Sequence, residues 1–91
     1  MSSNKTILFI ALCLSLFIAC SEPANEYVES GISHVKLGEY QKAIEDYTKA
    51  IELNPEDAIK SRLYSARGWS YDELGEDLKA IKDYIRAGEL E

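Results

Sequence analysis

The stretch LGEYQKAIEDYTKAIELNP spans residues 37–55, and the similar stretch LGEDLKAIKDYIRAGELE spans residues 74–91. The two stretches place the same residue types 37 positions apart. The matched pairs are Tyr27 and Tyr64, Gly31 and Gly68, Gly38 and Gly75, Ala43 and Ala80, Ile44 and Ile81, Tyr47 and Tyr84, and Ala50 and Ala87. A period in the range of about 20–50 residues indicates stacked supersecondary units that share a core. The chain therefore contains two copies of one structural unit.

Helix boundaries follow from the spacing of apolar residues and from glycine and proline. Apolar residues recur at helical intervals within each copy. Gly38 and Gly75 predict helix ends, because glycine adopts the left-handed conformation that caps a helix. Asn54 followed by Pro55 predicts a helix start, with asparagine as the cap and proline at the first helical position. We expect helices over residues 25–37, 40–53, 56–74 and 77–90, and hence an all-α fold of two stacked helix-turn-helix units.

Gly31 and Gly68 fall in the middle of two expected helices. Glycine in a helix interior costs about 1 kcal/mol relative to alanine. Its presence at both equivalent positions predicts that the following helix approaches too closely for a side chain to fit. The small residues Ala43 and Ala80 are the expected neighbours.

The combined pattern resembles the tetratricopeptide repeat, whose consensus is W-x2-L-G-x2-Y, then A-x3-F, then P. The first unit has Tyr27-x2-Ser30-Gly31-x2-His34, then Ala43-x3-Tyr47, then Pro55; the second has Tyr64-x2-Arg67-Gly68-x2-Tyr71, then Ala80-x3-Tyr84. The resemblance covers residues 24–91 and implies a short α-solenoid. Ser30 and Arg67 stand where the family usually has leucine, and the period of 37 exceeds the usual one of about 34 residues.

Residues 1–19 have the features of a signal peptide. Lys5 and the amino terminus provide a positive start, and an apolar run extends from Ile7 to Ala19. This run has the length of a signal-peptide core and is short for a membrane span, which needs roughly 20 apolar residues. A buried helix and a short signal anchor are the alternatives.

The segment Leu16-Phe17-Ile18-Ala19-Cys20 resembles the lipobox of bacterial lipoproteins. In that family a small residue precedes a cysteine that becomes the lipid-modified first residue of the mature chain. Ala19 and Cys20 match this pattern, whereas Phe17 stands where the family usually has leucine. The resemblance implies lipidation of Cys20. An ordinary secretory signal cleaved near Ala19 is the alternative.

The resemblances to lipoproteins and to tetratricopeptide repeats together imply a domain order and a location. Residues 20–24 would form a lipidated linker, residues 25–57 the first repeat unit and residues 58–91 the second. After cleavage Cys20 is the only cysteine left, so no internal disulfide can form. Ser21 resembles the residue that follows the cysteine in outer-membrane lipoproteins. We expect an exported chain anchored to the bacterial cell envelope, at the outer membrane where the organism has two membranes.

Composition and motifs argue against nucleic-acid binding and catalysis. The formal charge of −6 becomes −7 when Lys5 is removed with the signal peptide, and such a chain repels phosphate backbones. His34 is the only histidine, and we expect it to pack on the inward face of its helix. The four acids within residues 72–77 lack the spacing of a calcium loop, which favours a solvated turn over a cation site. We expect no catalytic residue, no cofactor and no metal.

The resemblance to tetratricopeptide repeats implies a groove lined by the first helix of each unit, where a peptide or protein segment binds. The groove residues expected here are Val28, Ile32, Val35, Arg62 and Trp69. Val28 and Ile32 occupy positions where chaperone-binding members carry polar clamp residues, so a receptor for chaperone tails is not favoured. Trp69 is either an anchor for an apolar ligand or a packing residue between helices, and the sequence leaves both open.

A stack of two units leaves one apolar face without a neighbouring repeat. At least three units and a polar cap are normally needed, so we expect Ile81 and Ile85 to be partly exposed as an assembly face. A small core without a disulfide favours association through this face over a marginal monomer. Two functional hypotheses follow: a membrane-anchored, non-catalytic protein–protein interaction module, or a structural subunit that assembles end to end with itself or another repeat protein.

Overall fold

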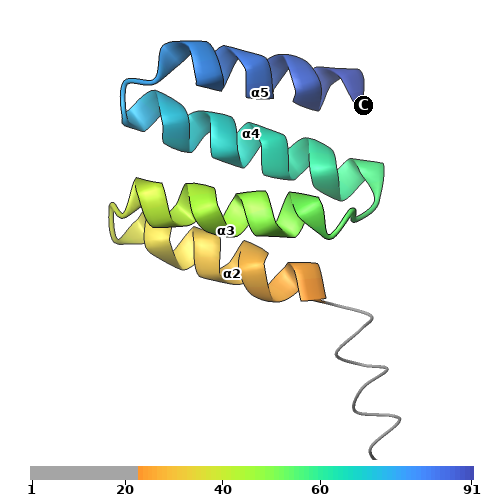
Figure 1. Cartoon of the computed structure of the whole chain (residues 1–91), viewed down its shortest axis with the longest axis horizontal. Helices are drawn as coiled ribbons and strands as arrows, with labels where there is room; N and C mark the ends of the chain where they lie inside the picture. Colours follow the sequence, from red (N-terminus) through yellow and green to blue (C-terminus); the bar gives the residue numbers. More distant parts are fainter. Residues whose placement is uncertain (1–22) are drawn as a thin grey trace, which may run out of the picture.

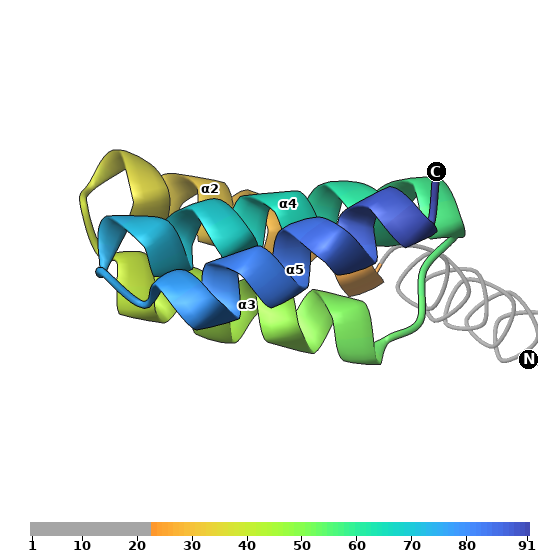
Figure 2. The same ribbon diagram turned by 90° about the horizontal axis from the view of Figure 1, so that it is seen from above.

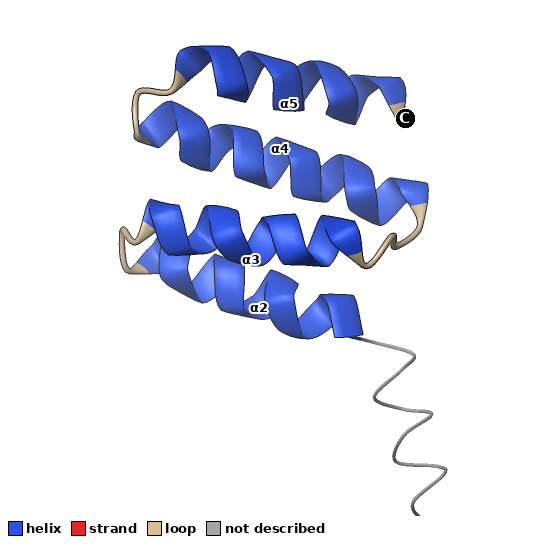
Figure 3. Cartoon of the chain, viewed as in Figure 1, coloured by secondary structure: helices blue, strands red, loops and turns tan. Residues whose placement is uncertain are grey.

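The computed structural model describes residues 23–91 as a stack of helices (Figure 1). The elements are α2 (Pro23–Lys36), α3 (Tyr40–Glu52), α4 (Asp57–Glu73) and α5 (Asp77–Glu89). Figure 3 shows that short loops join them and that this part of the chain contains no strand. The expected all-α fold is confirmed. The signal peptide and the lipidation of Cys20 concern residues that lie outside the described range.

The helices follow one another in space in the order of the chain. Extensive contacts join α2 to α3, α3 to α4 and α4 to α5. Successive helices run in opposite directions, so α2 with α3 and α4 with α5 form two helical hairpins (Figure 1). Seen along the stack in Figure 2, α2 and α4 overlap on one side and α3 lies on the other. The two hairpins thus form a short α-solenoid of adjacent helix pairs.

The glycines expected at helix ends are confirmed in that role. Gly38 has a φ of 75° and Gly75 a φ of 78°. The residue after each glycine donates its backbone N–H to a carbonyl five residues earlier: Glu39 to His34 at 2.8 Å and Glu76 to Tyr71 at 2.9 Å. This left-handed turn satisfies carbonyl groups that the end of a helix leaves unpaired. Both units therefore turn from their first to their second helix in the same way.

The prediction for Asn54 and Pro55 is wrong. Glu56 flanks the start of α4, which begins at Asp57, so neither residue has the predicted place in the cap. Asn54 instead has a φ of 53°, and its N–H donates to the Ile51 carbonyl oxygen at 2.9 Å. Asparagine tolerates the left-handed conformation better than most residues, so it ends α3 instead of starting α4. Its side-chain oxygen accepts a hydrogen bond from the Lys60 ammonium group at 3.0 Å.

The core explains the glycines inside the helices. Ala43, Tyr47, Ala50 and Leu63 form a buried cluster that joins α3 to α4. A Cβ atom on Gly31 would lie 2.6 Å from Cε1 of Tyr47. The predicted close approach is confirmed, and the atoms nearest to this Cβ position belong to the Tyr47 ring.

At the equivalent site in the second unit both kinds of neighbour are present. A Cβ atom on Gly68 would lie 3.0 Å from Cε1 of Tyr84 and 3.2 Å from the carbonyl oxygen of Ala80. The predicted approach of Ala80 is therefore confirmed. In both units a helical glycine leaves room for the tyrosine ring of the following helix.

Candidate functional site

A pocket with a volume of about 440 Å³ opens between α2 and α4. Its walls are Asn25, Val28 and Ile32 from α2, Tyr47 from α3, and Ile59, Arg62, Leu63 and Ala66 from α4. The contacts between α2 and α4 are fewer than those between successive helices. The two helices therefore leave a space between them, which α3 also borders. Apolar side chains form most of the lining. Such a site suits an apolar side chain accompanied by a polar group.

Three of the five predicted groove residues line the pocket, and the other two lie outside it. Val28, Ile32 and Arg62 line the pocket together. Val35 packs against the buried core cluster instead. Trp69 lies edge-on to Tyr40, with ring centroids 5.6 Å apart and an interplanar angle of 75°. Trp69 does not line the pocket.

Trp69 has one of the two roles that the sequence left open, a packing contact between helices. Its ring contacts Tyr40 at the start of α3, so it packs between helices of the two units. It is also 42% exposed, so part of the ring is available to a partner. The geometry supplies a packing contact and leaves the anchor role open.

Five further residues line the pocket, and of these Asn25 and Ala66 lie on the expected helix faces, whereas Tyr47, Ile59 and Leu63 were not expected. Tyr47 and Leu63 belong to the core and also present a surface to the pocket. Ile59 lies one helical turn before Arg62 and Leu63, which also line the pocket. Ile59 could have been predicted from Arg62, because residues three or four positions apart lie on the same face of a helix.

Arg62 is the cationic group of the pocket wall. It is exposed, and among residues 23–91 no acidic side chain lies within ion-pair distance of it. Tyr47 also lines the pocket. Burial raises the pKa of the Tyr47 hydroxyl group, and the negative charge of Asp46 raises it further. The pocket therefore offers one cation, without an ion-pair partner in this part of the chain, beside its apolar walls.

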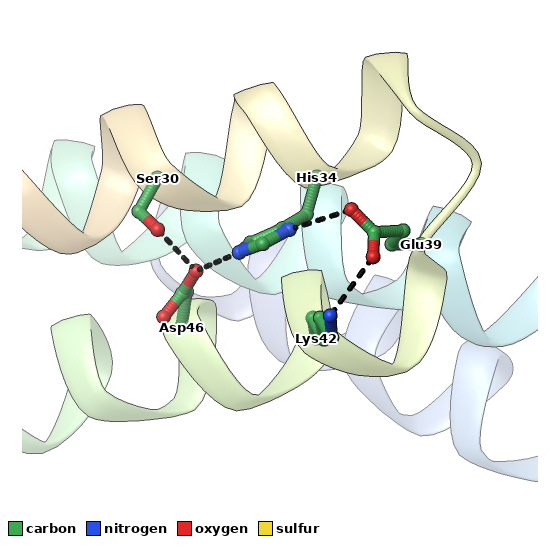
Figure 4. Close-up of polar contacts among 5 residues, drawn as sticks. All are labelled: Ser30, His34, Glu39, Lys42 and Asp46. Atoms are coloured by element: carbon green, nitrogen blue, oxygen red, sulfur yellow. Dashed lines mark hydrogen bonds and ion pairs between the residues drawn. The ribbon is translucent and has the colours of Figure 1, made fainter.

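His34 bridges two carboxylates in the first unit (Figure 4). Its Nδ1 atom lies 3.2 Å from Oε1 of Glu39, and its Nε2 atom lies 3.6 Å from Oδ2 of Asp46. Ser30 donates a hydrogen bond to the same Asp46 oxygen at 2.7 Å. Hydrogen bonds from Lys42 and then His34 lower the pKa of Glu39. The histidine is half-buried, as a packing residue would be, but its contacts are polar and link α2 to α3.

The second unit has a stronger polar link at equivalent positions. Arg67 and Asp83 correspond to Ser30 and Asp46, and they form two hydrogen bonds of 2.8 and 2.7 Å. Arg67 also donates to the Thr48 hydroxyl group at 3.1 Å. The hydrogen bond to Asp83 raises the pKa of Arg67. Arg67, where the family usually has leucine, thus connects α4 to both α3 and α5.

These polar groups link neighbouring helices. Within residues 23–91 no group of three or more histidine, cysteine, aspartate or glutamate side chains is arranged to hold a metal ion. The hydrogen bonds and ion pairs of these groups, which include Arg67, Asp83 and His34, join neighbouring helices, which is a structural role.

None of the helices of this part of the chain has the length and hydropathy needed to cross a membrane.

The two residues of the predicted assembly face lie on the outer side of the stack. Ile81 is 52% exposed and Ile85 is 59% exposed. Leu78, which the sequence did not single out, is 78% exposed on the same helix. An isolated exposed isoleucine is ordinary, whereas several on one helix face indicate a contact surface.

Comparison with known proteins places the first hairpin in a family. A family model for the tetratricopeptide repeat matches residues 24–57, which include nearly all of α2 and the whole of α3. No curated protein matches the chain closely enough to count as a relative. Residues 24–57 are a tetratricopeptide repeat, and the four described helices have the architecture of a short solenoid of that kind.

Proposed function

We propose that this protein is a non-catalytic interaction module that holds a peptide or protein segment in the pocket between α2 and α4. The observation that carries the proposal is the pocket itself, with its apolar walls and with Arg62, which has no ion-pair partner among residues 23–91. A tetratricopeptide repeat is a protein-interaction repeat, and one is present at residues 24–57. The ligand that fits best inserts one apolar side chain and places an acidic or carbonyl group near Arg62.

Replacing Ile32 by glutamate is expected to weaken binding of the partner by about 10-fold to 100-fold. Burial of one isoleucine side chain contributes about 1.5–3 kcal/mol, and the new carboxylate would be desolvated in the pocket. Ile32 is 43% exposed, so the substitution leaves the core intact. The measurement is photo-crosslinking in cells from position 28, with mass spectrometry of the captured protein.

Leu37→Glu provides the matched control for this experiment. Leu37 is an exposed leucine just after α2, and it is not part of the pocket wall. The control is expected to capture the same partner as the wild-type protein. Capture that survives Ile32→Glu but is lost in Leu37→Glu would show that the binding site lies elsewhere.

The proposed module is exported and held at the cell envelope by a lipid on Cys20. The support is the resemblance of residues 16–20 to a lipobox. Growth with a palmitate analogue is expected to label the wild-type chain and the Cys13→Ser variant, and to leave Cys20→Ser unlabelled. Labelling that depends on Cys13, or on neither cysteine, would reject the anchor. Fractionation of labelled cells would then test the expected location at the outer membrane.

A second candidate function is that of a structural subunit. The observation that favours it is the exposed apolar face of α5, which is separate from the pocket. The two functions make different demands on the molecule, because one uses the space between α2 and α4 and the other uses the far side of α5.

A further inference from the structure

The outer face of α5 carries an apolar strip that no described residue covers. Leu78, Ile81 and Ile85 form the strip, since they recur at helical intervals and more than half of each side chain is exposed. The equivalent positions of the first unit show which part of this face a following helix covers. Ile44 in α3 is the counterpart of Ile81 and is only 4% exposed, and α4 packs on α3. The counterpart of Ile85, Thr48, is partly buried, whereas that of Leu78, Gln41, is exposed. Ile81 and Ile85 therefore lie at positions that are covered in the first unit.

The opposite end of the stack does not complement this strip. Leu63 and Ala66 are among the α4 residues packed on the α3 cluster. Their counterparts in α2 are Glu26 and Glu29, and both are exposed. A head-to-tail stack would bury these carboxylates against Ile81 and its neighbours, with a large desolvation cost. Open end-to-end assembly of identical chains through α2 and α5 is therefore disfavoured.

Two charged residues flank the strip on α5. Asp77 lies on one side and Lys82 on the other, and neither has an ion-pair partner among residues 23–91. When two parallel helices meet through such a strip, flanking residues five positions apart face each other across the contact. Asp77 of one copy would then face Lys82 of the other, and a twofold axis would form this pair twice.

We propose that α5 is a homodimer interface in which two copies pack α5 against α5 in parallel. The strip supplies the buried apolar contact, and two reciprocal ion pairs between Asp77 and Lys82 fix its direction. Such a contact uses the same surface on both copies, so it closes at two chains and does not propagate. The inference rests on the second proposed function and gives it a partner and a geometry. The pocket between α2 and α4 takes no part in the contact.

The test uses the full-length chain in the cells that produce it, with a photo-reactive phenylalanine analogue at position 78. Irradiation is expected to give a product of twice the chain mass. Ile85→Lys is expected to reduce this product at least about tenfold, because it places a charge within the apolar strip. Ile32→Lys is the matched control: it adds the same charge at an exposed isoleucine of the pocket, and the dimer yield should stay unchanged.

A charge exchange tests the parallel arrangement. Asp77→Lys and Lys82→Asp are each expected to lower the dimer yield by about threefold to tenfold, since each creates like charges across the contact. The double variant Asp77→Lys/Lys82→Asp restores opposite charges and is expected to recover the wild-type yield. Recovery in the double variant also shows that the single variants were not simply misfolded.

Three results would overturn the homodimer. They are a product of a mass other than twice that of the chain, a dimer yield unaffected by Ile85→Lys, and a double charge variant that fails to recover. In antiparallel helices Asp77 would not face Lys82 of the partner, so single charge variants that leave the dimer yield unchanged would overturn the parallel arrangement. The capture of a ligand in the pocket would be unaffected in each case, so the two proposals fail separately.

Discussion

Replacing Arg67 by leucine is expected to lower the free energy of unfolding by about 3–5 kcal/mol. The leucine matches the residue that the family usually has at this position, but it removes both hydrogen bonds to Asp83. Asp83 is only 5% exposed, so its carboxylate would remain buried without a partner. Thr48 would lose its bond to α4 as well. The measurement is urea unfolding of residues 21–91, followed by Trp69 fluorescence and circular dichroism.

The double variant Arg67→Leu/Asp83→Leu separates the value of the ion pair from the cost of leaving one charge unpaired. Replacing a buried ion pair by apolar residues is often neutral or stabilising. We expect the double variant to recover most of the stability lost in Arg67→Leu. Equal destabilisation of the single and double variants would show that the pair itself, and not the stranded carboxylate, accounts for the effect.

Gly31→Ala is expected to destabilise the protein by about 1–3 kcal/mol, as overpacking of a core does. Alanine is the better helix former by about 1 kcal/mol, so propensity alone predicts the opposite sign. The new Cβ atom would lie 2.6 Å from Cε1 of Tyr47. That ring is 3% exposed and belongs to the core cluster, so it has little room to move. Urea unfolding again provides the measurement.

Two other helical glycines serve as controls for this result. A Cβ atom on Gly88 would meet nothing within 4 Å, so Gly88→Ala is expected to stabilise α5 by up to about 1 kcal/mol. Gly68→Ala should fall between the two, because its neighbour Tyr84 is partly exposed and can shift. A stabilising effect of Gly31→Ala would show that Tyr47 moves aside.

Much of the fold could be predicted because the decisive signals are local. The spacing of apolar residues follows the geometry of a single helix, and Gly38 and Gly75 end helices through their own backbone conformation. Asn54 shows where local chemistry is ambiguous. Its side chain suits both a helix start and a left-handed helix end, and the path of the chain between α3 and α4 selected the second.

The candidate site could be predicted only in part. Val28, Ile32 and Arg62 line the pocket as expected, because their helix faces follow from the repeat. Val35 and Trp69 do not, since their positions depend on how far α2 lies from α4 and on the side chains that α3 presents. The distance between α2 and α4 cannot be predicted from the residue pattern of a single helix.

The sequence by itself determined the helices, their order and the existence of two similar units, because these depend on residues a few positions apart. The tertiary structure alone decided which partners those residues meet. Arg67 pairs with Asp83 sixteen residues away and also donates to the Thr48 hydroxyl group of α3. Such contacts depend on the register between packed helices, which is set by the whole interface. The signal peptide and the lipid on Cys20 remain predictions from the sequence.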